Sequence, residues 1–195
     1  MIIRKLVKYL PKFIRDKINY LRFFIIRPKQ LIAYQDYRYS DERIKCVHLL
    51  ECINYIRVSE PMDVPPVYFE FGCHSGRTFS AVINAAHYLG MKDVQFYAFD
   101  SFEGFGELLD EDKHPFYEDS NFEASYEKVN SRVKKIGKDI NYKLIKGFFS
   151  DSLAPGAESY GIKKSRIVFI DSDTYNSAID ALLFVLPTIQ EGSYI

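Results

Sequence analysis

The residues best suited to chemistry lie in the segment VYFEFGCHSGRT, which spans Val67–Thr78. An apolar run is followed at once by Gly72 and Gly76, and then by a pattern typical of a helix. A buried strand, a glycine turn and a helix N-terminus in this order can hold a nucleotide cofactor, because glycines let a ligand approach the backbone. Glu70 lies just before the turn, and an acid there favours a cofactor with positive charge or hydroxyl groups. A purely structural strand-to-helix turn is the alternative.

Further polar residues occupy the same turn and the end of the next apolar run. His74 and Ser75 can offer polar contacts to a ligand. Asp100 ends the run QFYAFD, and its carboxylate has two acceptor oxygens that suit the hydroxyls of a ribose. Phe102 and Phe105 follow it and can cover a planar ring. The alternative is that Asp100 only caps the loop.

The third segment of interest is KGFFSD, which follows another short strand pattern. Gly147 permits close approach of a ligand to the backbone, and Phe148 can flank an aromatic base. Ser150 and Asp151 are polar candidates, but they are equally suited to cap the next helix.

The fourth segment is IDSDTY, where Asp171 ends an apolar run and Asp173 follows it. Two carboxylates at a strand end can bind a hard divalent cation or accept a proton, and Asp171 is the better placed of the two. A structural turn acid is the alternative. His48 and His87 fall in helical patterns and are interpreted as packing or surface residues. His114 lies in the long loop, where a role without substrate contact is favoured over contact with a substrate.

The four segments recur because apolar strands alternate with amphipathic helices from residue 67 onward. The predicted strands are Val67–Phe71, Val94–Phe99, Tyr142–Ile145, Arg166–Ile170 and Ser193–Ile195. The predicted helices are Thr78–Leu89, Phe122–Ile136, a short piece near Ser152–Tyr160 and Ser177–Ile189. This alternation predicts an α/β fold, a parallel sheet with helices on both faces, in which the four segments share the carboxyl edge. The loop Ser101–Ser120 is long enough to be functional.

The charge of the chain divides it into two predicted domains. The formal net charge is zero, yet nine of the ten charged residues up to Gln30 are basic. Residues 1–35 are predicted to form a basic amphipathic helical arm, and residues 36–195 to form the cofactor-binding domain, with a helix from Ser40 to about Val58 leading into it. The arm either packs on the protein itself or on a second subunit of a homo-oligomer, or makes peripheral contact with an anionic membrane through residues 1–32.

Cysteine content and the absence of a long apolar run predict a cytoplasmic protein. Cys46, Cys52 and Cys73 form neither a disulfide framework nor a metal knuckle. No uncharged apolar run approaches the length of a membrane span. We expect a small-molecule or glycan substrate and no nucleic-acid partner.

Taken together and in order, the four segments resemble class I S-adenosylmethionine-dependent methyltransferases, and most closely the macrocin O-methyltransferase (TylF-type) family. They read FEFGCHSGRT, FYAFDSFEGF, KGFFSDSL and FIDSDTYNSAIDALLFVLPTIQEGSYI. The resemblance implies a Rossmann-like methyltransferase core, preceded by N-terminal helices, that methylates a hydroxyl of a sugar or other polyhydroxyl natural product. Members of that family continue beyond the Ser193–Ile195 segment, so we expect this chain to be truncated at the fifth strand.

The resemblance also implies roles for individual residues. The residues implied for the cofactor are Glu70 and Gly72 at its methionine end, His74, Ser75 and Gly76 in the same turn, Asp100 at its ribose, Ser101 and Phe102 beside its adenine, and Gly147, Phe148 and Ser150 as the adenine wall. Asp171 is implied to be catalytic, near the transferred methyl group, and to be a ligand of a magnesium ion that lowers the pKa of the acceptor hydroxyl.

Three other functions remain open on the sequence alone. The first is a domain that binds the cofactor but is inactive. The second is a nicotinamide-dependent oxidoreductase, against which the position of Glu70 and the lack of a G-x-G-x-x-G motif argue. The third is a membrane-surface adaptor built on the basic arm.

Overall fold

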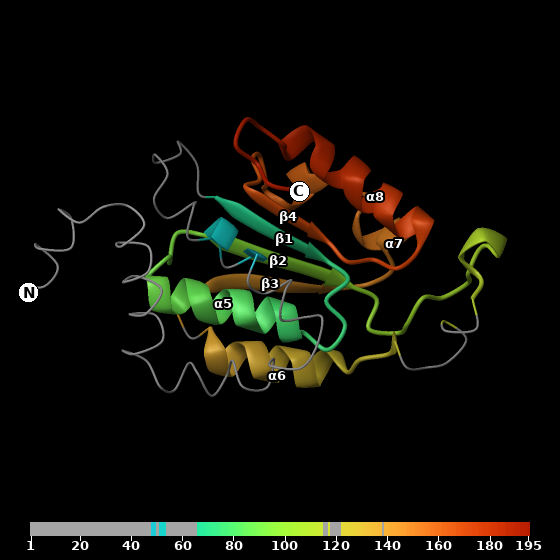
Figure 1. The fold of residues 1–195 in the computed structure, drawn as a ribbon, viewed down its shortest axis with the longest axis horizontal. Helices are drawn as coiled ribbons and strands as arrows, with labels where there is room; N and C mark the ends of the chain where they lie inside the picture. Colours follow the sequence, from blue (N-terminus) through green and yellow to red (C-terminus); the bar gives the residue numbers. More distant parts are fainter. Residues whose placement is uncertain (1–47, 50, 54–65, 115–116, 118–121, 138) are drawn as a thin grey trace, which may run out of the picture. The chain divides into compact units, whose positions relative to one another are not determined.

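A computed structural model describes residues 48–49, 51–53, 66–114, 117, 122–137 and 139–195 (Figure 1). The predicted arm of residues 1–35 lies outside the described residues. Of the helix predicted over residues 41–58, only five residues are described, and all five are helical. Among the helices that are described, none has the length and apolar character needed to cross a membrane.

The core of the fold is a four-stranded parallel sheet with the order β3-β2-β1-β4. The strands are β1 (Val67–Phe71), β2 (Gln95–Asp100), β3 (Asn141–Lys146) and β4 (Ile167–Ile170). The observed bounds of β1 equal the predicted ones, and each bound of the other three strands differs by at most one residue. Because β1 lies between β2 and β4, the turn that follows it adjoins the ends of both neighbours. The predicted α/β fold is confirmed.

The fifth predicted strand, Ser193–Ile195, is wrong as a strand. Only one parallel bridge forms there, between Ile167 and Tyr194. A turn immediately before it, in which Ser193 N–H donates to Gln190 O at 2.9 Å, delays entry into the sheet. Val168 N–H then donates to Tyr194 O at 2.8 Å, so pairing begins and extends no further within the described chain.

Helices cover both faces of the sheet. Figure 1 shows α5 (Arg77–Leu89) and α6 (Tyr126–Ile136) on one face, with α7 (Phe149–Ser152) and α8 (Tyr175–Val185) on the other. Side chains alternate along each strand, so successive β1 residues enter different cores. Tyr68 packs in the core under α5 and α6, whereas Phe69 and Phe71 pack with Phe184 of α8.

Local capping explains where the observed helices differ from the predicted ones. The helix predicted from Phe122 begins at Tyr126, because the Ser125 hydroxyl accepts the N–H of Lys128 at 3.3 Å and sets the N-terminus there. The piece predicted near residues 152–160 is split into α7 and a 3₁₀ turn, η4 (Ala157–Tyr160), with Pro155 and Gly156 between them.

The last helix also differs in its bounds. It begins at Tyr175, two residues before the predicted start, and ends at Val185, where the 3₁₀ turn η5 (Leu186–Thr188) continues it. Pro187 in that turn lacks the N–H that an α-helix needs, which accounts for the early end.

Candidate cofactor and acceptor site

The turn after β1 is pressed against the end of β4. Gly72 has φ +86, and its N–H donates to Phe99 O at 2.9 Å. A Cβ at this position would overlap the carbonyl oxygen of Asp171, so any other side chain would push the two turns apart. Asp171 N–H donates in turn to Phe71 O at 2.9 Å. The glycine therefore brings the backbone of Asp171 against the predicted cofactor turn.

At Gly76 a glycine is required by packing against α6 rather than by close approach to β4. It ends the turn with φ +68 and is the N-cap residue of α5. A Cβ there would lie 2.5 Å from Cγ1 of Val129, so its small size lets α6 pack closely. The turn is held from the same side by Arg132, whose Nη1 donates to Ser75 O at 2.7 Å. Packing against α6 accounts for this glycine without a ligand.

Glu70 is almost completely buried, with 1% of its surface exposed. Its Oε2 accepts a hydrogen bond from the hydroxyl of Tyr68 at 2.6 Å, and a backbone hydrogen bond from Phe79 in the first turn of α5 also reaches the carboxylate. Burial raises the pKa of Glu70 to about 8; the Tyr68 hydrogen bond opposes that rise, and the nearby charge of Asp171 adds to it. Glu70 of β1 thus supplies the side-chain acceptor at the N-terminus of α5 that the N-cap residue, Gly76, lacks.

Asp100 joins the two turns that follow β1 and β2. Its Oδ2 accepts the N–H of His74 at 2.7 Å, and its Oδ1 accepts the N–H of Phe102 at 2.7 Å. Both partners have positive φ, +43 and +57, which is a strained conformation for residues with a side chain. Each carboxylate oxygen retains a further lone pair, so the carboxylate can hold the turns and still accept hydroxyl groups.

The third predicted segment adjoins Asp100 through the backbone. Gly147 N–H donates to Asp100 O at 3.0 Å, which places Phe148 next to the same strand end. The Phe148 ring is half-buried and borders the loop after β2, where a Cβ on Gly106 would lie 2.9 Å from its Cε1. Ser150 is exposed on α7.

Ser101 shapes the loop that follows β2. Its hydroxyl donates to Gly104 O at 2.6 Å and accepts the N–H of Glu103 at 3.1 Å. Phe102 is buried and packs edge-on against Tyr126 of α6, with ring centroids 5.2 Å apart. Phe102 is therefore part of the α6 packing as well as of the site.

An aromatic cluster further along this loop was only partly predicted. Phe105 packs on Phe122 and Tyr117, with centroids 4.5 and 5.0 Å away, and Phe122 also faces His74 at 6.4 Å. These ring contacts place the loop next to the turn after β1. The sequence signal that could have identified the cluster is the concentration of aromatic residues in and after the long loop. Among Phe105, Tyr117 and Phe122, only Phe105 was given a role from the sequence.

The end of β4 leads into a turn that is only partly buried. Asp171 is half-buried and Asp173 is exposed. Between them, the buried hydroxyl of Ser172 has no hydrogen-bond partner among the described residues. The described part of the chain also contains no group of three or more His, Cys, Asp or Glu side chains placed to hold a metal ion. Asp171 therefore stands without a complete set of metal ligands there.

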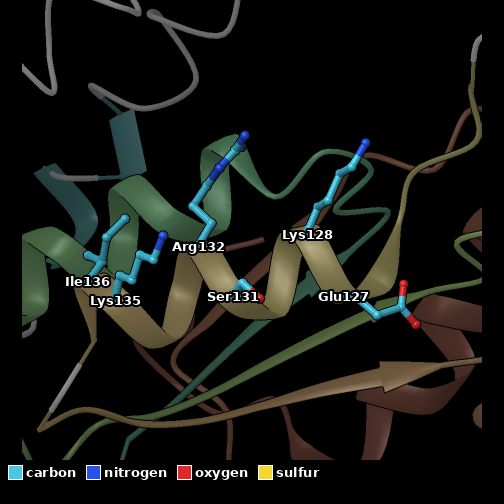
Figure 2. A pocket seen from close by; sticks show the side chains of 6 residues that line it. All are labelled: Glu127, Lys128, Ser131, Arg132, Lys135 and Ile136. Atoms are coloured by element: carbon cyan, nitrogen blue, oxygen red, sulfur yellow. The ribbon is translucent and has the colours of Figure 1, made fainter.

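A cavity of about 560 Å³ lies along α6 and is separate from these residues (Figure 2). It is lined by Glu127, Lys128, Ser131, Arg132, Lys135 and Ile136. None of the predicted cofactor residues lines it. The turns of Gly72, Asp100, Gly147 and Asp171 meet at the carboxyl edge of the sheet, and the site predicted there stays a prediction.

Comparison with solved structures supports the α/β fold described above. The crystal structure of CalS11, a calicheamicin methyltransferase, matches 97% of this chain and 72% of its own, with 18% sequence identity and a TM-score of 0.60. The O-methyltransferase NovP matches 75% of this chain, with 19% identity and a TM-score of 0.63, and the match spans 61% of NovP. At these identities the likeness shows the fold alone. No curated protein sequence matches the chain significantly.

The family assignment comes from the sequence as a whole. A sequence model described as macrocin O-methyltransferase (TylF) matches residues 40–195. That region contains all four turns at the carboxyl edge of the sheet and the helices that support them. The chain is thus a methyltransferase that belongs to the macrocin O-methyltransferase family.

Proposed function

We propose that this protein transfers a methyl group from S-adenosylmethionine to a hydroxyl of a sugar or other polyhydroxyl natural product. Family membership supports methyl transfer to oxygen. The observation that carries the cofactor assignment is Asp100, whose two carboxylate oxygens hold the turns of His74 and Phe102 at 2.7 Å and retain capacity for a ribose. No G-x-G-x-x-G turn is present, which disfavours the nicotinamide alternative.

The side chains at the carboxyl edge have the chemistry that S-adenosylmethionine requires, which supports the proposal. Gly72 keeps the turn after β1 narrow, and Glu70 lies beneath it as a neutral carboxyl that a cation can bring to its charged form. Phe102, Gly147 and Phe148 are proposed to surround the adenine, with Ser101 and Ser150 at its margin. The remaining turn residues, His74, Ser75 and Gly76, are proposed to line the methionine end. The cofactor supplies a methyl group activated by the positive charge on sulfur.

The acceptor hydroxyl must lose a proton as its oxygen is methylated, and Asp171 is the proposed proton acceptor. Its backbone is fixed against Phe71 O and against Gly72, so its carboxylate extends from a rigid strand end. A positioned carboxylate of this kind can contribute general base catalysis. The magnesium predicted from the family resemblance needs further ligands, and the described residues supply no such group around Asp171. The proposed proton transfer therefore uses the carboxylate itself.

Calorimetric titration with S-adenosylmethionine, S-adenosylhomocysteine and NAD tests the cofactor assignment. We expect both adenosyl compounds to bind and NAD not to bind. Binding of NAD alone would overturn the methyltransferase proposal. Binding of S-adenosylmethionine without methyl transfer to any of a panel of sugar acceptors would favour the inactive cofactor-binding domain.

Replacing Asp100 with Ala should weaken S-adenosylhomocysteine binding by about 1–3 kcal/mol, the value of charge-assisted hydrogen bonds to a ligand. Asp100→Asn keeps one acceptor oxygen, so its affinity should lie between those of the wild type and Asp100→Ala. Asp93→Ala removes an exposed acid before β2 and serves as the control. Equal affinity of all three variants and the wild type would show that Asp100 only shapes the turns.

The remaining partners and the location stay predictions. Peripheral membrane contact through residues 1–32 predicts that the intact chain sediments with anionic liposomes and that a chain without those residues does not. Homo-oligomer formation predicts a mass above 22.8 kDa in sedimentation equilibrium. Cytoplasmic localisation predicts fractionation with soluble markers of the cell.

A further inference from the structure

A hydrogen bond joins the loop after β2 to the first turn of α8. Asp112 lies in η1 (Asp110–Asp112), and its Oδ1 and Oδ2 accept the backbone N–H of Tyr175 at 3.0 and 3.3 Å. Tyr175 is the first residue of α8. A carboxylate at this position satisfies a backbone donor that the helix itself leaves without a partner, and it is favoured by the helix dipole. The contact joins residues that lie far apart in the sequence.

The residue that would normally cap α8 is otherwise engaged. Thr174 is the N-cap residue, but its side chain makes no cap hydrogen bond to the backbone. Its hydroxyl donates instead to the hydroxyl of Ser177 at 2.7 Å. Asp112 therefore supplies the side-chain acceptor that the local sequence of α8 does not.

The contact lies between the two sides of the candidate site. The loop leaves the sheet at Asp100, which holds the turns of the proposed cofactor site, and α8 follows directly after Asp171 and Asp173. Figure 1 shows this loop extending beyond the carboxyl ends of the strands, on the side where α8 begins. Holding η1 at the start of α8 keeps residues 101–114 beside the carboxyl edge. The same segment carries Phe105 and borders Phe148 at Gly106.

We propose that Asp112 is a positioning residue, which fastens residues 101–114 to the N-terminus of α8 and thereby controls how fast the demethylated cofactor leaves the site. The fastening rests on the observed hydrogen bonds, and its effect on cofactor release rests on the proposed function. Exposed, neighbouring Asp110 supplies a matched control, because it lies in the same 3₁₀ turn but pairs with Lys113 at 2.6 Å rather than with α8.

The first experiment compares Asp112→Ala, Asp112→Asn and Asp110→Ala by amide hydrogen exchange and by limited trypsin digestion. Loss of the acceptor should speed exchange of the Tyr175 amide by on the order of ten-fold or more and speed cleavage after Lys113, as expected when a charge-assisted hydrogen bond is lost. Asp112→Asn should be intermediate, because it retains a neutral acceptor. Asp110→Ala should match the wild type in Tyr175 exchange.

The second experiment measures dissociation of S-adenosylhomocysteine from the same variants by surface plasmon resonance. We expect release from Asp112→Ala to be about ten-fold faster than from the wild type, and release from Asp110→Ala to be unchanged. A purely structural cap would change the thermal midpoint without changing this rate.

Two results would overturn the proposal. One is wild-type exchange and cleavage in Asp112→Ala, which would show that the hydrogen bond does not hold the loop. The other is faster Tyr175 exchange with an unaltered release rate, which would show that the loop does not control the cofactor. If the wild-type protein binds no S-adenosylhomocysteine, the proposed function fails, control of release fails with it, and the exchange and cleavage results still decide whether Asp112 fastens the loop.

Discussion

The N-termini of α5 and α8 face the same edge of the sheet, and each is capped by an acid from another part of the chain. At α5 the acid is Glu70, which comes from β1 and is 1% exposed. At α8 it is Asp112, which comes from a loop and is only half-buried. One acid belongs to the central strand of the sheet, and the other to a loop outside the sheet. The capping hydrogen bond is thus buried in the core at α5 and partly exposed at α8.

The turns that lead into α5 and α8 meet where Gly72 lies against the backbone of Asp171, so replacement of Gly72 should have the largest effect. In Gly72→Ala the new methyl group would overlap Asp171 O, and the residue would keep a positive φ. We expect the free energy of unfolding to fall by about 4 kcal/mol, from the steric overlap and the backbone conformation together. Urea denaturation measures this loss.

Gly90→Ala is the control for that substitution. Gly90 also has a positive φ, +70, but a Cβ there meets no atom within 4 Å. It should cost only about 1–2 kcal/mol, the price of the backbone conformation alone. Equal losses at Gly72 and Gly90 would mean that close approach at Gly72 does not hold the turns after β1 and β4 together.

The second prediction concerns the buried cap of α5 and the dependence of stability on pH. The pKa of Glu70 is about 8 in the folded protein, against an ordinary value of 4.5. Between these values the unfolded chain has lost the proton and the folded chain has kept it, so rising pH favours unfolding. Glu70 should lower the free energy of unfolding by up to about 1.4 kcal/mol per pH unit across this interval.

Urea denaturation at pH 5, 6.5 and 8 tests this effect in Glu70→Gln. The difference in stability between wild type and variant should change steadily with pH, by about 3 kcal/mol in total, in favour of the variant at high pH. Glu158→Gln alters an exposed acid in η4 and should follow the wild-type curve. Parallel curves for Glu70→Gln and wild type would show that Glu70 is charged in the folded protein.

The smallest effect should come from α6, whose N-terminus is capped by its own sequence. The Ser125 hydroxyl accepts the N–H of Lys128 at 3.3 Å in an exposed position. Ser125→Ala should cost about 0.5–1 kcal/mol in thermal or urea denaturation and leave cofactor affinity unaltered. A large loss of cofactor affinity would show that the cap of α6, like those of α5 and α8, influences the proposed site.

The sequence was sufficient to place the strands and the turns of the site. Apolar runs that carry Glu70, Asp100 and Asp171 at or near their ends predicted β1, β2 and β4. Because parallel strands end on the same side of a sheet, the runs also predicted that these acids lie at one edge. Capping also had a local signal at Ser125. The helix predicted from Phe122 nevertheless began too early, since apolar spacing marks the face of a helix better than its first residue.

Contacts between distant residues could not be predicted in the same way. Nothing near Asp112 in the sequence indicates Tyr175 as its partner, and the last helix was predicted to begin only at Ser177. The direction of the Glu70 side chain was also hidden, because an acid at the end of a strand can face a ligand or the adjoining helix. The packing of Gly76 against Val129 was hidden as well, because the sequence does not indicate which helix lies against this turn. These features depend on tertiary packing.

The position of β1 at the centre of the sheet also has a consequence for the order in which a growing chain can fold. Tyr68 pairs with Phe96 about thirty residues later, but with Ile167 about a hundred residues later. During synthesis β2 can pair with one edge of β1 early. The other edge of β1 stays unpaired until β4 is made, and Phe69 and Phe71 lack their contact with Phe184 until α8 is made. Late, long-range pairing of this kind slows folding and leaves an apolar strand edge open to association with other chains.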